Sequence, residues 1–145
     1  MVIKTGFLNK AILFVDDNRT IQKIVKNIVD ESEFRLDVIS ALTGEDAIEI
    51  LYNKDGAPKP SIILLDLNLP AMNGQEVLKA IQQDKDLQNI PVVVLTASDD
   101  QEEINDLKKQ GARECYTKPF DFYLFNTLVE KIVKKWCQNP NQTLC

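Results

Sequence analysis

The sequence predicts a single α/β domain built around a parallel, doubly wound β-sheet with helices on both faces. Three apolar runs, AILFV (11–15), IILL (62–65) and VVVL (92–95), contain no alternating polar residues, which is typical of strands buried on both faces. Segments with helical periodicity separate these runs. Strands that alternate with helices favour right-handed crossovers and a parallel sheet. The 145 residues fit one compact domain.

We expect five strands and five helices in strict alternation. Two weaker strands, RLDVIS (35–40) and ECYT (114–117), join the three apolar runs. Helices are expected over 18–31, from Thr43 as N-cap to about Asn53, from about Asn73, over 99–110 and over 121–137. The helix over 99–110 ends before Gly111, a C-cap residue, and has only Ile104 and Leu107 as apolar anchors. We therefore expect it to be the least firmly held.

The order of strands and helices predicts one domain at 9–138, between an N-terminal extension (1–8) and a flexible C-terminal tail (139–145).

Acidic residues outnumber basic ones, 22 to 17, which argues against nucleic-acid binding because such proteins normally show a basic face. No apolar run is long enough to cross a bilayer, and no signal peptide is evident. Cys115, Cys137 and Cys145 show no metal-ligand spacing and predict reduced thiols in the cytoplasm.

Histidine is absent from the chain. This excludes Ser-His-Asp or Cys-His catalysis within the chain, any histidine-ligated metal site and any role as a phosphohistidine donor. The chemistry must therefore depend on carboxylates, hydroxyls and lysine.

Polar side chains follow four of the predicted strands. Asp16 and Asp17 come after the first strand, Asp66 after IILL, Thr96 after VVVL and Lys118 after ECYT. In a doubly wound sheet, binding residues gather at the carboxyl ends of the strands. One aspartate after a strand is usually a turn former or a helix cap, but that explanation does not account for polar groups at four strand ends in one chain.

Three carboxylates in one cleft repel one another, so at least one pKa should rise. A hard divalent cation relieves this repulsion, and a ligand set made only of oxygen suits Mg²⁺, with Mn²⁺ as the alternative. Lys118 would add a positive charge and Thr96 a hydroxyl donor. Together these groups form a site suited to a phosphoryl group.

The chain resembles the receiver domain of bacterial two-component response regulators over about residues 9 to 137. The matching segments are Asp16-Asp17, LLDLNLPAMNG around Asp66, VVVLTAS around Thr96, and YTKPF from Tyr116. The resemblance implies a flavodoxin-like (βα)5 fold with strand order 2-1-3-4-5. The long connector before the third strand, with LLDLNLP and PVVVLTAS, is most similar to single-domain regulators associated with phytochrome-type kinases, whereas KPFDF is closer to the general family.

The resemblance implies that Asp66 accepts a phosphoryl group from a phosphohistidine on a partner. Asp17, Asp66 and the backbone carbonyl of Asn68 would bind Mg²⁺ directly, and Asp16 would act mainly through water. Lys118 would pair with Asp66 and then with a phosphoryl oxygen.

The remaining implied roles concern switching and dephosphorylation. Thr96 would hydrogen-bond a phosphoryl oxygen, and Tyr116 would turn inward as Thr96 moves. Ala97 would leave access for the phosphoryl group, while Asn68 and Ser98 would tune dephosphorylation. The switching face would consist of the fourth helix, the fifth strand and the fifth helix.

The implied partners are a sensor histidine kinase, for which the phytochrome type is one candidate, or a histidine phosphotransfer protein, and a downstream protein target. Neither nucleic acid nor membrane is expected as a partner, and a homodimer through the last helix stays open. The chain would phosphorylate and dephosphorylate itself without turning over a separate substrate, so it would not be an ordinary enzyme. The resemblance also implies a cis bond between Lys118 and Pro119.

Three other classes of protein share part of this pattern. A haloacid-dehalogenase-like phosphatase also uses an aspartate nucleophile with Mg²⁺, but it needs a second acid two residues later, where this chain has Asn68. A flavin-binding electron carrier needs a glycine- and hydroxyl-rich phosphate loop, where this chain has DDNRT. An inert interaction module with a receiver fold would have a broken site, whereas the five site positions are intact.

Overall fold

The computed structural model describes residues 10–53 and 59–138. The predicted extension (1–8) and tail (139–145) lie outside the described residues. Strands and helices alternate as predicted. Their bounds are β1 Ala11–Val15, α1 Arg19–Asp30, β2 Asp37–Ala41, α2 Gly44–Tyr52, β3 Ile62–Asp66, α3 Gly74–Gln83, β4 Val92–Thr96, α4 Gln101–Lys109, β5 Glu114–Thr117 and α5 Phe122–Gln138.

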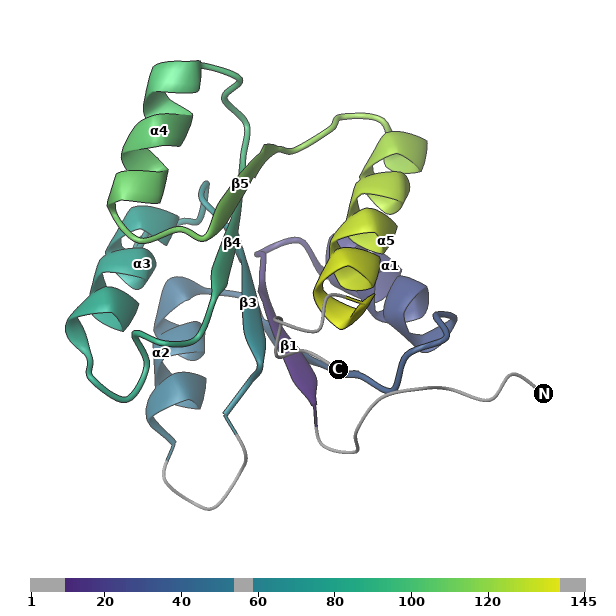
Figure 1. The fold of residues 1–145 in the computed structure, drawn as a ribbon, viewed down its shortest axis with the longest axis horizontal. Coiled ribbons are helices and arrows are strands. Elements are labelled where there is room, and N and C mark those ends of the chain that lie inside the picture. The colour runs from purple at the N-terminus through teal and green to yellow at the C-terminus, as the bar shows by residue number, and fades with distance from the viewer. Residues whose placement is uncertain (1–9, 54–58, 139–145) are drawn as a thin grey trace.

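The five strands form one parallel sheet in the order β2-β1-β3-β4-β5, which confirms the predicted topology. Helices α1 and α5 cover one face, and α2, α3 and α4 cover the other (Figure 1). The chain order reverses direction across the sheet between β1 and β3, which is the switch point where such sheets bind ligands.

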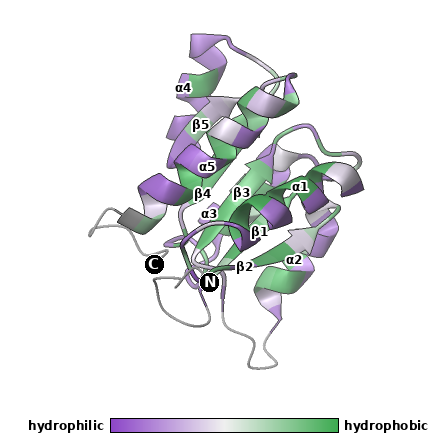
Figure 2. Ribbon diagram, turned by 90° about the vertical axis from the view of Figure 1, so that its right-hand side faces the viewer, coloured by the Kyte–Doolittle hydropathy of each residue, from purple (hydrophilic) through white to green (hydrophobic). Residues whose placement is uncertain are grey.

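Two apolar cores lie on opposite faces of the sheet. Ile12 and Phe14 of β1 pack toward α1 and α5, while Leu13 and Val15 pack toward the other three helices. Because β1, β3 and β4 are covered on both faces, all their residues are buried, which explains the unbroken apolar runs. Figure 2 shows these apolar strands between the helix layers.

Local sequence signals define the ends of the helices. Asn18, Thr43 and Asn73 are N-caps, and each side chain accepts hydrogen bonds from backbone N–H groups of the first turn. After α4, Gly111 adopts a φ of +114°, a left-handed value that favours glycine. Leu107 is the buried residue of α4, so this helix has the sparse anchoring that the sequence predicted.

Several expectations need correction. The second strand begins at Asp37 rather than 35, and Leu36 packs into the core ahead of it. The peptide bond between Lys118 and Pro119 is trans. Cys115 is a free thiol, but Cys137 takes part in a disulfide, so the prediction of reduced thiols is wrong for Cys137. Among the described residues, no helix combines the length and apolar character needed to span a membrane.

Candidate functional site

The predicted site residues meet at the carboxyl rim of the sheet. Asp16 follows β1, Asp66 is the last residue of β3, Thr96 is the last residue of β4, and Lys118 follows β5. The register places Asp66 beside Leu95 and pairs Thr96 with Thr117, so these strand ends lie level with one another. The parallel topology therefore assembles in space the groups that the sequence separates.

The three carboxylates of the acid cluster, Asp16, Asp17 and Asp66, each offer an oxygen within 4.8 Å of the others. Asp16 is fully buried and Asp66 is 4% exposed, whereas Asp17 is exposed. A cleft lined by Asp17, Leu67, Asn68, Leu69, Pro70, Asn73 and Gln75 opens beside the cluster. The cluster is therefore buried on its sheet side and accessible from the side of Asp17.

This donor set fits a hard divalent cation. Three carboxylates that share a small volume and carry no sulfur or nitrogen ligand are suited to Mg²⁺ or Mn²⁺. Such a cation would offset the mutual repulsion of Asp16, Asp17 and Asp66.

Lys118 supplies the positive charge at the inner side of the cluster. Its Nζ lies 2.8 Å from Asp16 Oδ2 and 3.3 Å from Asp66 Oδ2. The resemblance implied a pair with Asp66, and the structure shows that Lys118 bridges both acids, with the shorter contact to Asp16. The backbone N–H of Lys118 also donates to the carbonyl of Thr96 at 2.7 Å, which ties the end of β5 to β4.

Burial raises the pKa of Asp66 above its usual 3.8. The Asn68 N–H and the charge of Lys118 oppose this shift, and the charge of Asp16 adds to it. The sequence predicted a raised pKa from repulsion among acids, and the structure shows that burial is the larger cause. Burial lowers the pKa of Lys118, but hydrogen bonds and charges from Asp16 and Asp66 outweigh it, so that this pKa stands above 10.5.

Metal-free protein is expected to lose stability as pH rises above 3.8, the unfolded pKa of Asp66, and through the higher pKa that this carboxyl has in the folded chain. Because the folded pKa lies above the unfolded value of 3.8, the folded chain holds this proton more tightly. The resulting stabilisation is fully present below the unfolded pKa and is lost as pH rises through the folded pKa. Urea unfolding of wild type and Asp66→Asn across this range isolates the effect, and superimposable pH profiles would contradict it.

The loop after β3 holds Asp66 in a fixed orientation. The N–H of Asn68 donates to Asp66 Oδ1 at 3.1 Å, and the N–H of Gly74 donates to the carbonyl of Leu67 at 3.0 Å. A Cβ on Gly74 would lie 2.6 Å from Leu67 Cα and 2.8 Å from the carbonyl of Asp66. Glycine therefore allows α3 to begin directly against the phosphoacceptor candidate. Asn68 itself is exposed at the mouth of the site.

Thr96 is buried, and its Oγ1 accepts a hydrogen bond from the Ser98 N–H at 3.1 Å. The hydroxyl of Thr117 donates to the carbonyl of Ser98 at 3.0 Å, so the loop after β4 is tied to β5. Ala97, between Thr96 and Ser98, is exposed. The structure thus places Thr96 in the strand end, and Ala97 and Ser98 in the loop that follows it.

Tyr116 of β5 is half-buried and packs against the core on the α1 and α5 side of the sheet. Lys131 Nζ lies 5.8 Å from its ring centroid. Burial and then the charge of Glu114 raise the pKa of the phenol. Glu114 also accepts a hydrogen bond from Trp136 Nε1 at 2.8 Å and pairs with Lys135. A movement of Tyr116 would therefore affect contacts along α5.

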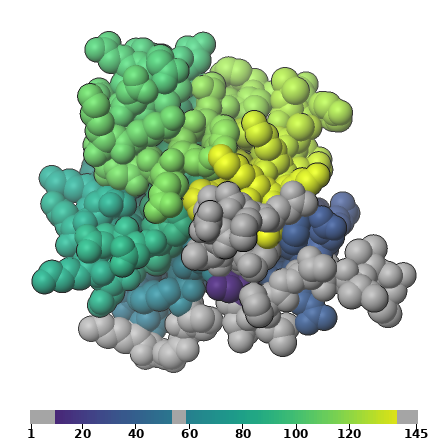
Figure 3. Space-filling model, viewed as in Figure 1, coloured from purple at the N-terminus to yellow at the C-terminus, as the bar shows by residue number. Residues whose placement is uncertain are grey.

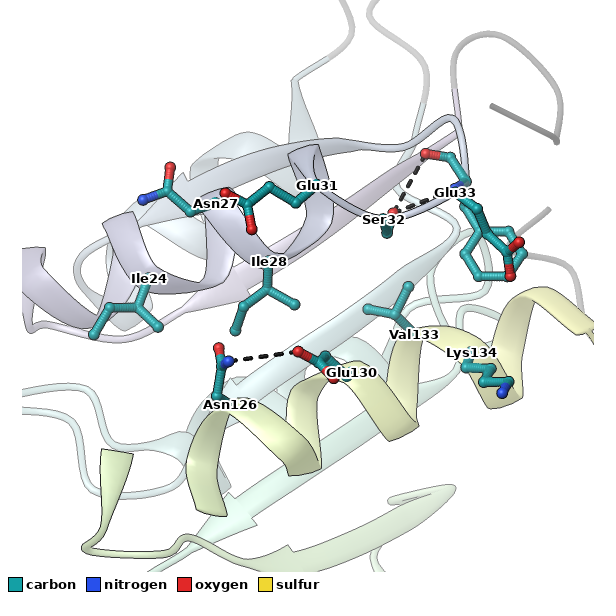
Figure 4. A pocket seen from close by; sticks show the side chains of 11 residues that line it. Ile24, Asn27, Ile28, Glu31, Ser32, Glu33, Asn126, Glu130, Val133 and Lys134 are labelled. Carbon is teal, nitrogen blue, oxygen red and sulfur yellow. Dashed lines mark hydrogen bonds between the residues drawn. The ribbon is translucent and has the colours of Figure 1, made fainter. Parts of the chain in front are cut away.

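A second cleft lies between α1 and α5 (Figure 4). Its floor contains Ile28 and Val133, and Asn126 donates to Glu130 across one turn of α5. It contains none of the predicted site residues, so it is separate from the acid cluster.

One buried polar residue beside the site was not predicted. Gln22 occupies the buried face of α1 and contacts the end of β1. Its only signal in the sequence is a polar residue within the apolar stripe of Ile21, Ile24, Val25 and Ile28.

Comparison with known proteins identifies the family. A model of the response regulator receiver domain matches residues 12–132. Response regulator Rcp1 of Synechocystis sp. is 38% identical over 98 residues, which cover 66% of this chain and 67% of that protein.

Solved structures agree with this match. The Mn²⁺-bound form of Rcp1 has a TM-score of 0.83 and 32% identity, and the match covers 94% of this chain and 99% of that one. The phosphorylated cyanobacterial phytochrome response regulator RcpA has a TM-score of 0.82 and 30% identity, covering 90% of this chain and 95% of that one. The chain therefore has the flavodoxin-like fold of these proteins, with its carboxylates, lysine and threonine at the carboxyl rim of the sheet. The chain belongs to the response regulator receiver domain family of two-component signalling.

Proposed function

We propose that this receiver domain is a phosphorylation switch in which Asp66 accepts a phosphoryl group in a Mg²⁺-dependent reaction. The observation that carries this proposal is the convergence of the acid cluster with Lys118 and Thr96 at one rim. Mg²⁺, or Mn²⁺ in its place, would be held by Asp17, Asp66 and the backbone carbonyl of Asn68, with Asp16 nearby. When bound, the cation would neutralise charge on the phosphoryl oxygens.

In the proposed reaction, a carboxylate oxygen of Asp66 forms a bond to phosphorus, and the bond between phosphorus and the donor nitrogen breaks. The leaving imidazole keeps the electron pair of that bond. Lys118 and the Asn68 N–H each hold one oxygen of the Asp66 carboxylate, so the nucleophile is oriented before the donor arrives. Lys118 would then stabilise charge on a phosphoryl oxygen.

The donor we propose is a phosphohistidine on a sensor kinase or phosphotransfer protein. These 145 residues contain no histidine, so the phosphohistidine lies outside them. The likeness to RcpA, a cyanobacterial phytochrome response regulator, supports a phytochrome-type kinase as that partner. We propose that this transfer takes place in the cytoplasm.

The signal would leave through the face formed by α4, β5 and α5, which adjoin one another in Figures 1 and 3. A phosphoryl group adds dense negative charge at the rim, and Thr96 would move to donate to it. The bonds of Ser98 with Thr96 and Thr117 would carry that movement toward Tyr116. Sparse anchoring of α4 through Leu107 makes this helix the element able to shift.

A downstream protein target would read this face. Phe120, Phe122, Tyr123 and Leu124 expose large apolar side chains beside it, at the start of α5. Exposed apolar clusters of this kind mark surfaces that bind other proteins. We propose that the receiver unit spans 9–138 and acts through such contacts without turning over a separate substrate.

Incubation with acetyl phosphate tests the proposal because this small donor needs no kinase. We expect wild-type protein to gain one phosphate in intact-mass spectra when Mg²⁺ is present, and none when EDTA removes it. Mg²⁺ should also stabilise the folded protein against unfolding, by about 2.7 kcal/mol when its free concentration is about a hundred times its dissociation constant. Uptake that is equal with and without the metal would contradict the proposed site.

A further inference from the structure

Gln22 is a polar residue in an otherwise apolar environment. It lies on the buried face of α1 together with Val25, Ile28 and Val29, and it is 6% exposed. Its Oε1 is buried and accepts no hydrogen bond from any residue that the structure describes. An unpaired buried acceptor lowers stability, whereas an aliphatic side chain here would leave no such atom. The benefit of glutamine must therefore come from its amide nitrogen.

That nitrogen joins two strand ends to the helix. Gln22 Nε2 donates to the backbone carbonyls of Phe14 at 3.1 Å, Asp16 at 3.0 Å and Ala41 at 3.0 Å. Phe14 belongs to β1 and Ala41 is the last residue of β2. The amide thus bridges the carboxyl ends of two strands at the point where the acid pair begins.

The same contacts restrain the turn that carries Asp16 and Asp17. The N–H of Asp16 donates to the carbonyl of Ala41 at 3.0 Å, so Ala41 links Asp16 to Gln22. The Asp16 carboxylate accepts from the Asn18 N–H at 2.8 Å and from Lys118. Asp16 is therefore held at its N–H, its carbonyl and its carboxylate, and Gln22 provides the carbonyl restraint.

We infer that Gln22 is a positioning residue for the metal site: its amide fixes the turn of Asp16 and Asp17, and metal affinity depends on that restraint. This inference rests on the proposed function, because it needs Mg²⁺ to bind at the acid cluster. Residues that orient metal ligands without touching the metal typically contribute 10- to 100-fold to affinity. Gln22 acts on the backbone of Asp16, the residue before the proposed ligand Asp17, so we expect an effect at the lower end of this range, about tenfold.

The test compares Gln22→Met with Val25→Ala in the full chain. Methionine keeps the length and helix propensity of glutamine but donates no hydrogen bond. Val25 is fully buried one turn further along α1 and packs in the apolar core, so its truncation is a control for lost stability alone. Calorimetric titration with Mg²⁺ is run at a temperature where circular dichroism shows every variant folded.

We expect Gln22→Met to weaken Mg²⁺ binding by about tenfold and Val25→Ala to leave it within about twofold of wild type. In acetyl phosphate assays, Gln22→Met should need more Mg²⁺ for half-maximal rate and should reach the wild-type rate at saturation. Gln22→Leu serves as the second apolar variant if Gln22→Met does not fold.

Three outcomes would overturn the inference. In the first, Gln22→Met binds Mg²⁺ as tightly as wild type. In the second, Val25→Ala weakens Mg²⁺ binding as much as Gln22→Met does, which would mean that Gln22 contributes to stability alone. Either result leaves the proposed metal site intact. If wild type itself binds no Mg²⁺, the proposed function fails at the metal and the inference fails with it.

Discussion

Replacing Asp66 by asparagine is expected to abolish phosphate uptake from acetyl phosphate and to raise the stability of the metal-free fold at neutral pH. An amide has the shape of the carboxylate but lacks its nucleophilic oxygen. The substitution also removes one of three clustered carboxylates, and burial makes that charge unfavourable in the folded chain. Intact-mass spectra measure the uptake, and thermal unfolding measures the stability.

Asp86→Asn is the matched control, because Asp86 is an exposed acid outside the acid cluster. This variant should take up phosphate at the wild-type level, and its stability should change by no more than about 0.5 kcal/mol. Phosphate uptake by Asp66→Asn equal to that of wild type would remove Asp66 from the role of acceptor. If metal-free Asp66→Asn were less stable than wild type at neutral pH, that result would contradict the electrostatic argument.

Replacing Lys118 by methionine is expected to slow phosphorylation by about 10²- to 10³-fold, the range for losing one group that stabilises developing charge. It should also destabilise the fold by about 3 kcal/mol, because Asp16 and Asp66 would stay buried without their cation. This figure is the lower end for a broken buried pair, since a quarter of the Lys118 side chain is exposed.

Lys85→Met, at an exposed lysine after α3, is the control for loss of a positive charge. The stability deficit of Lys118→Met should shrink at acid pH, where Asp66 with its raised pKa becomes protonated, and at saturating Mg²⁺, which replaces the missing charge. Rates of acetyl phosphate labelling and urea midpoints measure both effects. A deficit that is the same at all pH values would show that Lys118 acts through packing and not through its charge.

The sheet and its rim are predictable from the sequence because burial on both faces leaves a simple pattern. β1 is apolar throughout, and β3 and β4 are apolar up to their last residues, Asp66 and Thr96. Each apolar run therefore marks a strand, and the polar residue that ends or follows it marks the rim. β2 lies at an edge and is only partly buried, so RLDVIS gives a mixed pattern. The sequence therefore predicts a strand from 35, whereas β2 begins at Asp37.

Contacts between side chains from different elements are not encoded in such patterns. The sequence placed Lys118 at the rim, but only the packing of β5 against β4 shows that its Nζ reaches Asp16 as well as Asp66. The sequence does not reveal Gln22 for the same reason: its acceptors are carbonyls of Phe14 in β1, of Asp16 just after β1, and of Ala41 at the end of β2. The roles of Tyr116, Ala97 and Ser98 stay predictions.

The central claim is that the phosphoryl group resides on Asp66, and residue-level mapping of the phosphorylated protein tests it most directly. Borohydride reduces an aspartyl phosphate to homoserine, which peptide mass spectrometry then locates after proteolysis. Protein treated with acetyl phosphate and Mg²⁺ should contain homoserine at position 66 alone. Homoserine at Asp16 or Asp17, or phosphorylated protein without homoserine, would contradict the account.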